Sequence, residues 1–165
     1  MNTAALHEQC QARVRELLPG LSDYLIHHAQ RDPKGEALIE VETETVLTWR
    51  QLRRAVERLA ALLIREGLTK GDVVATCLPF TKEHVYLEYA CFMLGLIFAP
   101  LDYRLSPREL ISAFRRLKPR AFFFLGRTAR MDFRTVVEEV MEEAPYPELW
   151  VQFQRGRQGV DRKSV

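Results

Sequence analysis

The chain has 165 residues, 47% of them hydrophobic, which suits a single domain with a hydrophobic core. Its 24 basic and 22 acidic residues give a net charge of only +2, which argues against a dedicated nucleic-acid-binding protein, whose basic residues should be in clear excess. The longest apolar run, residues 89–101, is shorter than the ~20 residues of a membrane-spanning helix, and without a recognisable secretory signal we expect a cytoplasmic protein.

The first predicted elements are a short helix and a hairpin. The helix covers residues 21–29, with Ser22 as its cap. Two short runs, residues 37–41 and 45–49, are rich in strand-forming residues and are separated by three polar ones. We therefore expect an antiparallel hairpin ahead of the rest of the fold.

Residues 48–67 carry the clearest helix pattern. Thr48 and Gln51 have the spacing of a capping box, and Gly67 can close the helix in a left-handed conformation. Four apolar residues at helical spacing predict the buried face: Leu52, Val56, Leu59 and Leu63. The other side is mostly charged: Arg50, Arg54, Glu57, Arg58 and Arg65.

From residue 73 onward, strands and helices alternate. Apolar runs predict buried strands over residues 73–78, 97–101, 121–125 and 149–153. Helices are expected over residues 82–94, capped by Thr81, from Ser106-Pro107 to just before Pro119, and over 133–142. This alternation predicts an α/β fold with a mostly parallel sheet and helices on both faces, preceded by the short hairpin. The expected divisions are an extension over 1–20, an α/β subdomain over 21–153 and a basic flexible tail over 154–165.

Catalytic and metal-binding motifs are scarce. The glycines form neither G-x-G-x-x-G nor G-x-x-x-x-G-K-[ST], and there is no G-x-S-x-G nucleophile motif. Adjacent His27 and His28 point about 100° apart on a helix, which does not suit a shared metal ion. We expect His84 to be a surface or hydrogen-bonded histidine. The three cysteines are predicted to be reduced thiols: Cys10, Cys77 and Cys91.

Four arginines follow two consecutive predicted strands. Arg104, Arg108, Arg127 and Arg130 lie in or beside these segments. Open parallel sheets bind ligands at the carboxyl ends of their strands, and arginine suits anionic ligands such as phosphates. The alternative interpretation is that these arginines are simply solvated.

Four segments, in order, resemble the AMP-forming acyl-CoA synthetase family, also called the adenylate-forming superfamily. LTWRQL (47–52) resembles its TYxEL motif and GLTKGD (67–72) its GVxxGD turn. VVATCLP (73–79) resembles its VAIxLPN strand, and GLIFAPLDYRLSPREL (95–110) resembles GAVxVPLNPRLTPEEL. The resemblance covers about residues 21–153, and Phe80 departs from it where the family often has Asn.

The resemblance implies the amino-terminal part of an enzyme that converts a carboxylic or fatty acid, ATP and CoA into acyl-CoA, AMP and pyrophosphate. The phosphate loop, magnesium-dependent nucleotide chemistry and catalytic Lys belong to later family segments, so we expect no catalytic or metal-binding residue here and an inactive isolated chain. The family also implies that Arg104, Arg127 and Arg130 contact phosphates of CoA. The expected partner is the remainder of the synthetase, or a second copy through the uncovered surface.

Two other functions stay open at this point. One is a stand-alone, non-catalytic interaction or regulatory module with the same fold. The other is a flavodoxin-like ligand-binding domain, which the alternation of strands and helices would also allow.

Overall fold

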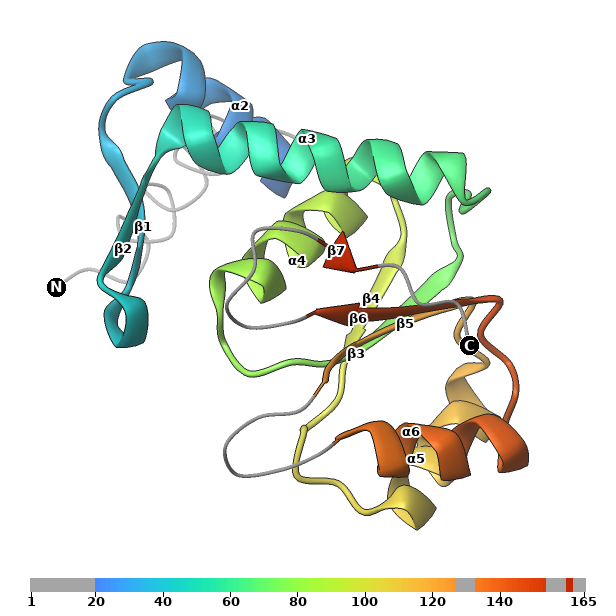
Figure 1. Ribbon diagram of the computed structural model, residues 1–165. Helices are drawn as coiled ribbons and strands as arrows, with labels where there is room; N and C mark the ends of the chain where they lie inside the picture. Colours follow the sequence, from blue (N-terminus) through green and yellow to red (C-terminus); the bar gives the residue numbers. More distant parts are fainter. Residues whose placement is uncertain (1–19, 127–132, 154–159, 162–165) are drawn as a thin grey trace, which may run out of the picture.

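The computed structural model describes residues 20–126, 133–153 and 160–161, and these residues form an α/β fold (Figure 1). The elements in chain order are α2 (Leu21–Arg31), β1 (Glu36–Glu40), a 3₁₀ turn (Val41–Thr43), β2 (Thr45–Thr48), α3 (Trp49–Arg65), β3 (Val73–Cys77), α4 (Lys82–Leu94), β4 (Ile97–Pro100), α5 (Pro107–Leu117), β5 (Ala121–Leu125), α6 (Phe133–Glu143), β6 (Leu149–Phe153) and β7 (Val160–Asp161). The predicted fold class is confirmed.

The main sheet has the order β4-β3-β5-β6-β7. Its first four strands are parallel, and β7 pairs antiparallel with β6. The chain adds β4 on one side of β3 and then crosses back to place β5 on the other side. Because these strands are parallel, the carboxyl ends of β3, β4 and β5 lie at one edge of the sheet, and ligands of open α/β folds bind at this edge where the strand order reverses.

Helices cover both faces of the sheet. In Figure 1, α4 lies against one face with α3 and α2 outside it, while α5 and α6 lie on the other face. The core is apolar on both sides of β5, whose five residues are all buried. Phe122 of β5 packs edge-on against Phe114 of α5, with ring centroids 4.9 Å apart.

The helix starts follow the predicted capping patterns at two of four positions. At α3, the Thr48 hydroxyl accepts a hydrogen bond from the Gln51 N–H, and the Gln51 side chain accepts one from the Thr48 N–H. Ser106 and Glu109 form the same box at α5. The predicted cap at Ser22 is wrong, because α2 begins after Gly20, whose N–H donates to the Asp23 carboxylate at 3.0 Å.

The strand predicted over residues 97–101 is present, but it is not buried. β4 is the edge of the sheet, and Ile97 is 53% exposed. An apolar run alone does not distinguish an edge strand from a central one, because both alternate with helices in the same way. A further difference is β7, a strand within residues 154–165, where the sequence has no apolar period.

The antiparallel hairpin of β1 and β2 stands beside α3. Ile39 pairs with Val46, and both side chains are exposed, at 57% and 47%. Glu40, the next residue on β1, is buried instead. No helix among the described residues is long and apolar enough to cross a membrane.

Candidate functional site

The carboxyl edge of the parallel sheet is the first candidate site. Three described segments meet there: residues 78–81 after β3, residues 101–106 after β4, and Gly126 after β5. Leu101 donates its N–H to the carbonyl of Thr76, which ties the second segment to β3. The segments therefore share one edge, as the sequence predicted from the order of strands and helices.

Arg104 lies at this edge, but its guanidinium already has a partner. Its Nη2 is 2.6 Å from Asp102 Oδ2, and its Nε is 3.0 Å from Asp102 Oδ1. Hydrogen bonds from Arg104 lower the pKa of the Asp102 carboxyl to about 2. Arg104 would therefore have to share or release Asp102 to bind an anion. Arg127 and Arg130, the other two predicted phosphate contacts, lie outside the described residues.

An exposed phenylalanine marks the loop after β3. Phe80 is 92% exposed, at the centre of a tight turn in which the Thr81 N–H donates to the Pro79 carbonyl at 2.7 Å. Its ring centroid is 5.2 Å from that of His84. The Phe80 ring is therefore accessible to a ligand or to another segment of protein.

His84 is buried, with 5% of its surface exposed, and its ring also contacts Phe98 at 5.3 Å. Burial lowers its pKa, which favours the neutral imidazole. Among the described residues, three buried side-chain polar atoms lack a hydrogen-bond partner: Thr76 Oγ1, Thr81 Oγ1 and His84 Nδ1. Thr76 lies on β3, Thr81 directly precedes α4, and His84 lies in the first turn of α4. His84 is therefore not at the surface, but it is a hydrogen-bonded histidine in part, because a backbone hydrogen bond with Leu78 acts on its pKa while Nδ1 has no partner among the described residues.

Glu40 holds the start of α4 in place of the predicted Thr81 cap. The Thr81 side chain makes no capping hydrogen bond. Instead, the Lys82 N–H donates to Glu40 Oε1 at 3.1 Å, and Lys82 Nζ donates to Glu40 Oε2 at 2.9 Å. Burial of Glu40 opposes ionisation, but hydrogen bonds from Thr43 and Lys82 outweigh it and lower the pKa of Glu40 to about 2. A carboxylate from the hairpin thus fixes the helix that begins at the sheet edge.

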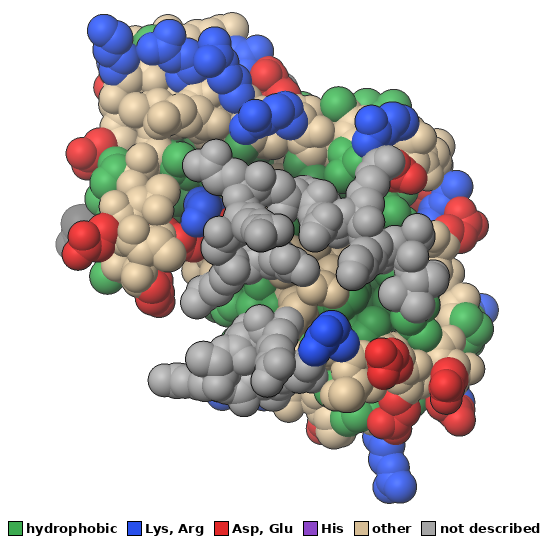
Figure 2. Space-filling model, viewed as in Figure 1, with side chains coloured by type: hydrophobic (Ala, Val, Ile, Leu, Met, Phe, Trp, Pro, Cys, Tyr) green, Lys and Arg blue, Asp and Glu red, His purple; other side chains and the backbone are tan. Residues whose placement is uncertain are grey.

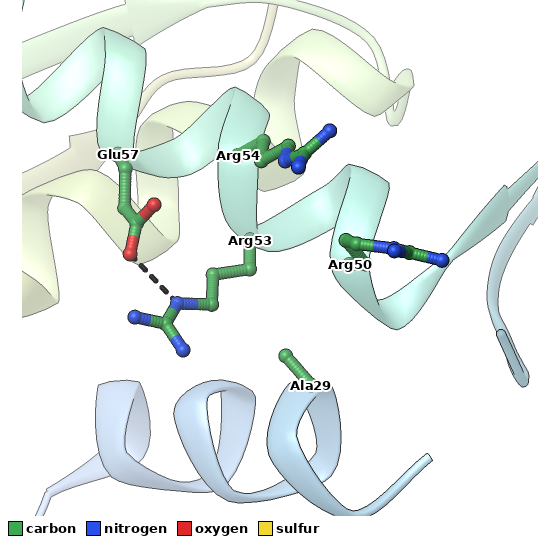
Figure 3. Close-up of a pocket in the computed structure, with 5 residues that line it drawn as sticks. All are labelled: Ala29, Arg50, Arg53, Arg54 and Glu57. Atoms are coloured by element: carbon green, nitrogen blue, oxygen red, sulfur yellow. Dashed lines mark hydrogen bonds and ion pairs between the residues drawn. The ribbon is translucent and has the colours of Figure 1, made fainter. Parts of the chain in front are cut away.

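A second candidate site is a pocket of about 210 Å³ between α2 and α3. It is lined by Ala29, Arg50, Arg53, Arg54 and Glu57. The Arg53 Nε lies 2.7 Å from Glu57 Oε1, whereas Arg50 and Arg54 extend away from that pair and from each other (Figure 3). The arginines therefore do not converge on one anion. The sequence had placed Arg50, Arg54 and Glu57 of this lining on the charged side of the helix, and none of the three is buried.

The described residues form neither a metal-binding cluster nor a glycine-rich loop that could hold the phosphates of a nucleotide. No group of three or more His, Cys, Asp and Glu side chains there is arranged to hold a metal ion. The described glycines with positive φ are Gly67, Gly71 and Gly95, and each precedes a strand, at the edge opposite to the candidate site. They therefore do not fit the triphosphate of ATP or its magnesium ion at the carboxyl edge.

Sequence reasoning missed Glu40 and the burial of His84. Glu40 lies between Ile39 and Val41, so alternation predicts only that it and its neighbours face opposite sides, and not which side is buried. His84 had a detectable signal, because it is the third residue of a helix that is apolar on most sides. A histidine within the first turn of such a helix has few positions from which to reach solvent.

The sequence matches the family described as "AMP-binding enzyme" over residues 25–161. It is 34% identical over 94 residues to "Protein Y" of Streptomyces griseus, covering 57% of this chain and 31% of that protein. It is 27% identical over 104 residues to the human "Acyl-CoA synthetase short-chain family member 3, mitochondrial", covering 61% of this chain and 15% of that protein.

Solved structures with the same fold are similar along most of the chain. A putative long-chain-fatty-acid CoA ligase from Rhodopseudomonas palustris superposes with a TM-score of 0.73 and 25% identity, covering 84% of this chain and 34% of that one. The N-terminal domain of FACL13 from Mycobacterium tuberculosis gives 0.74 at 22% identity, covering 82% and 34%. The chain thus spans about a third or less of the length of these proteins.

Proposed function

The chain belongs to the AMP-binding enzyme family, and from this premise we propose that it supplies the amino-terminal α/β unit of an AMP-forming acyl-CoA synthetase that acts in the cytoplasm. The complete enzyme would use ATP and magnesium to activate a carboxylic or fatty acid and would transfer the acyl group to CoA. Relatives named as acyl-CoA synthetases and ligases support this reaction class.

One observation carries the proposal: the family match runs from Leu25 to Asp161 and so includes every described strand. A match confined to one motif would be compatible with many α/β folds. Here the match extends over the hairpin, the long helix and the parallel strands, and the fold superposes on that of a CoA ligase.

The described residues provide a scaffold and not the reaction itself. Since they do not fit ATP or magnesium, we propose that the phosphate loop and catalytic Lys are supplied by the remainder of the synthetase, and that this chain alone does not activate acids. The remainder would cover exposed apolar side chains, such as Phe80 and the Ile39–Val46 pair of the hairpin. Arg104, Arg127 and Arg130 are proposed to contact phosphates of CoA.

A chimera tests the proposal. The residues of the Rhodopseudomonas palustris ligase that superpose on this chain would be replaced by this chain, and formation of acyl-CoA from ATP, CoA and a panel of fatty acids would be measured. We expect a folded chimera with acyl-CoA synthetase activity. The isolated chain should show only background exchange of pyrophosphate into ATP.

Two controls make the test decisive. The ligase lacking the replaced segment should be inactive, which shows that this chain supplies something necessary. A chimera that folds with a native-like melting transition but exchanges no pyrophosphate would contradict the proposal. Robust exchange by the isolated chain would contradict the assignment of catalysis to the remainder.

A further inference from the structure

The outer side of α3 carries an arginine stripe, defined here as Arg50, Arg54, Arg58 and Arg65, with Ala61 in the same sector between the last two. At 100° per residue, these four positions fall within about 80° of the helix circumference. They lie opposite the buried face of α3, and all four are exposed. The stripe therefore presents three evenly spaced positive charges over residues 50–58 of the helix and a fourth at its end.

Carboxylates of the described residues leave most of this charge uncompensated. The ion pairs formed by α3 are Arg53 with Glu57 and Arg65 with Glu66, the latter at 3.7 Å. None joins Arg50, Arg54 or Arg58 to a described carboxylate. Figure 3 shows Arg50 and Arg54 extended away from Glu57, and Figure 2 shows lysines and arginines gathered along the top of the molecule, where α2 and α3 lie.

The same chain carries a complementary face on α6. Glu138, Glu139, Glu142 and Glu143 are all exposed. Only Glu143 has an ion pair among the described residues, with Arg115 at 3.3 Å. Because α3 and α6 lie on opposite faces of the sheet (Figure 1), the two charged faces do not meet within one chain.

We propose that the arginine stripe of one chain binds the acidic face of α6 in a second copy. Arg50, Arg54 and Arg58 are spaced four residues apart, as are Glu138 and Glu142. Four residues correspond to about 6 Å along either helix, so two ion pairs form in register when the helices lie side by side. The charge complementarity selects a second copy as the occupant, and the contact does not depend on the synthetase reaction.

The contact is head-to-tail, because it joins two different surfaces. The dimer keeps a free acidic face on one chain and a free stripe on the other, so association continues past the dimer into rings or open chains. The proposed contact consists only of exposed charged side chains, and salt must therefore weaken the association of the two chains. The Debye length falls from about 30 Å at 0.01 M salt to about 3 Å at 1 M.

Sedimentation velocity of the chain at these two salt concentrations tests the proposal. At low salt, the weight-average sedimentation coefficient should rise with protein concentration, and at high salt it should stay at the monomer value. Two double variants, Arg50→Glu/Arg54→Glu in the stripe and Glu138→Arg/Glu142→Arg in the acidic face, are expected to remain monomeric at low salt. Mixing these two variants should restore association, because the stripe of the second then meets the acidic face of the first.

A matched control separates the contact from net charge. Lys70→Glu/Arg108→Glu changes the net charge as much as Arg50→Glu/Arg54→Glu does, at exposed positions outside the stripe, and should associate like the wild type. The proposal is overturned if the wild type is monomeric at low salt, or if the control variant loses association as much as Arg50→Glu/Arg54→Glu does. It is also overturned if the mixture of the two charge-reversed variants stays monomeric. Binding of the monomeric wild type to anionic lipid vesicles or RNA would also overturn it, by assigning the stripe another partner.

Discussion

Glu40 and Lys82 are 42 positions apart in the sequence, and the buried carboxylate of one caps the helix that the other begins. The Lys82 N–H and Nζ lie 3.1 Å and 2.9 Å from the two carboxylate oxygens. Through this contact the hairpin is fixed to α4, and the loop that carries Phe80 is fixed with it. The hairpin therefore helps to shape the carboxyl edge of the sheet from outside the sheet.

Replacing Glu40 should destabilise the fold. Glu40→Ala removes the cap of α4 and leaves Lys82 without its buried partner, so we expect a loss of about 2–4 kcal/mol in the free energy of unfolding. Urea denaturation measures it. Glu42→Ala, an exposed carboxylate on the same turn, serves as the control and should change stability by less than about 0.5 kcal/mol. Equal effects of the two variants would mean that the cap contributes nothing specific.

Stability should fall in acid through the same carboxylate. The pKa of Glu40 is lowered from 4.5 to about 2, so its contribution is complete above about pH 4.5 and is lost as the pH falls towards 2. Linkage gives a contribution on the order of 3 kcal/mol. In Glu40→Gln, which cannot ionise, this part of the pH dependence should be absent. Parallel curves for wild type and variant between about pH 7 and pH 3 would rule out Glu40 as its source.

The two capping boxes should each contribute to stability. Thr48→Ala leaves the Gln51 N–H without a side-chain partner, and Ser106→Ala does the same to the Glu109 N–H. Each substitution should cost about 1 kcal/mol. Ser112→Ala, at an exposed position inside α5, should be neutral or slightly stabilising because alanine favours a helix interior. Thermal unfolding of the three variants checks the ranking, and a loss at Ser112 as large as at Ser106 would contradict it.

Cys77 and Cys91 should be unreactive in the folded chain. Burial, with a smaller effect of Asp102 or Glu88, raises the pKa of each thiol to about 12, and thiolates are the reactive form. Cys10 lies outside the described residues, so the measurement uses Cys10→Ser. An aromatic disulfide reagent at neutral pH should label neither thiol until denaturant is added, and then both. Rapid labelling of the native protein would show that one of the strands or helices opens locally.

The fold could be predicted because its signals are local and repeated. Helix caps such as Thr48 with Gln51, and apolar runs such as residues 121–125, each define an element through neighbours in the sequence. The burial of individual elements depends on strand order, which the sequence does not encode locally. This is why β4 has the expected position in the chain and yet lies at the exposed edge, with Ile97 in contact with solvent.

The candidate site was less predictable for the same reason. Glu40 caps a helix that begins 42 residues later, and no spacing rule connects the two. Alternation along β1 would equally allow Ile39 to face the protein and Glu40 to face solvent, whereas the structure has the reverse. Arg104 was found from its place after a strand, but its pairing with Asp102 depends on the turn between them.

The pairing of Arg104 with Asp102 makes the proposed CoA contact testable with variants of opposite effect. If Arg104 contacts a phosphate of CoA, Asp102→Ala should free its guanidinium and strengthen binding several-fold, whereas Arg104→Ala should weaken it. An NMR titration measures both, against a wild-type Kd expected to be on the order of millimolar, or about −4 kcal/mol. Dephosphorylated CoA should respond less to either variant.

Arg127→Ala/Arg130→Ala tests the other two proposed contacts in the same titration, and it should weaken binding of CoA more than of the dephosphorylated form. Arg116→Ala, at an exposed arginine on α5, is the control and should leave binding unchanged.

The Asp102→Ala variant needs a control of its own. Because Asp102 carries a negative charge near the site, its removal also strengthens the binding of any anion non-specifically. Asp102→Ala is therefore combined with Arg104→Ala: if Arg104 is the contact, the gain disappears in the double variant. A gain that persists there would show that only the local charge changed, and would remove Arg104 from the CoA site.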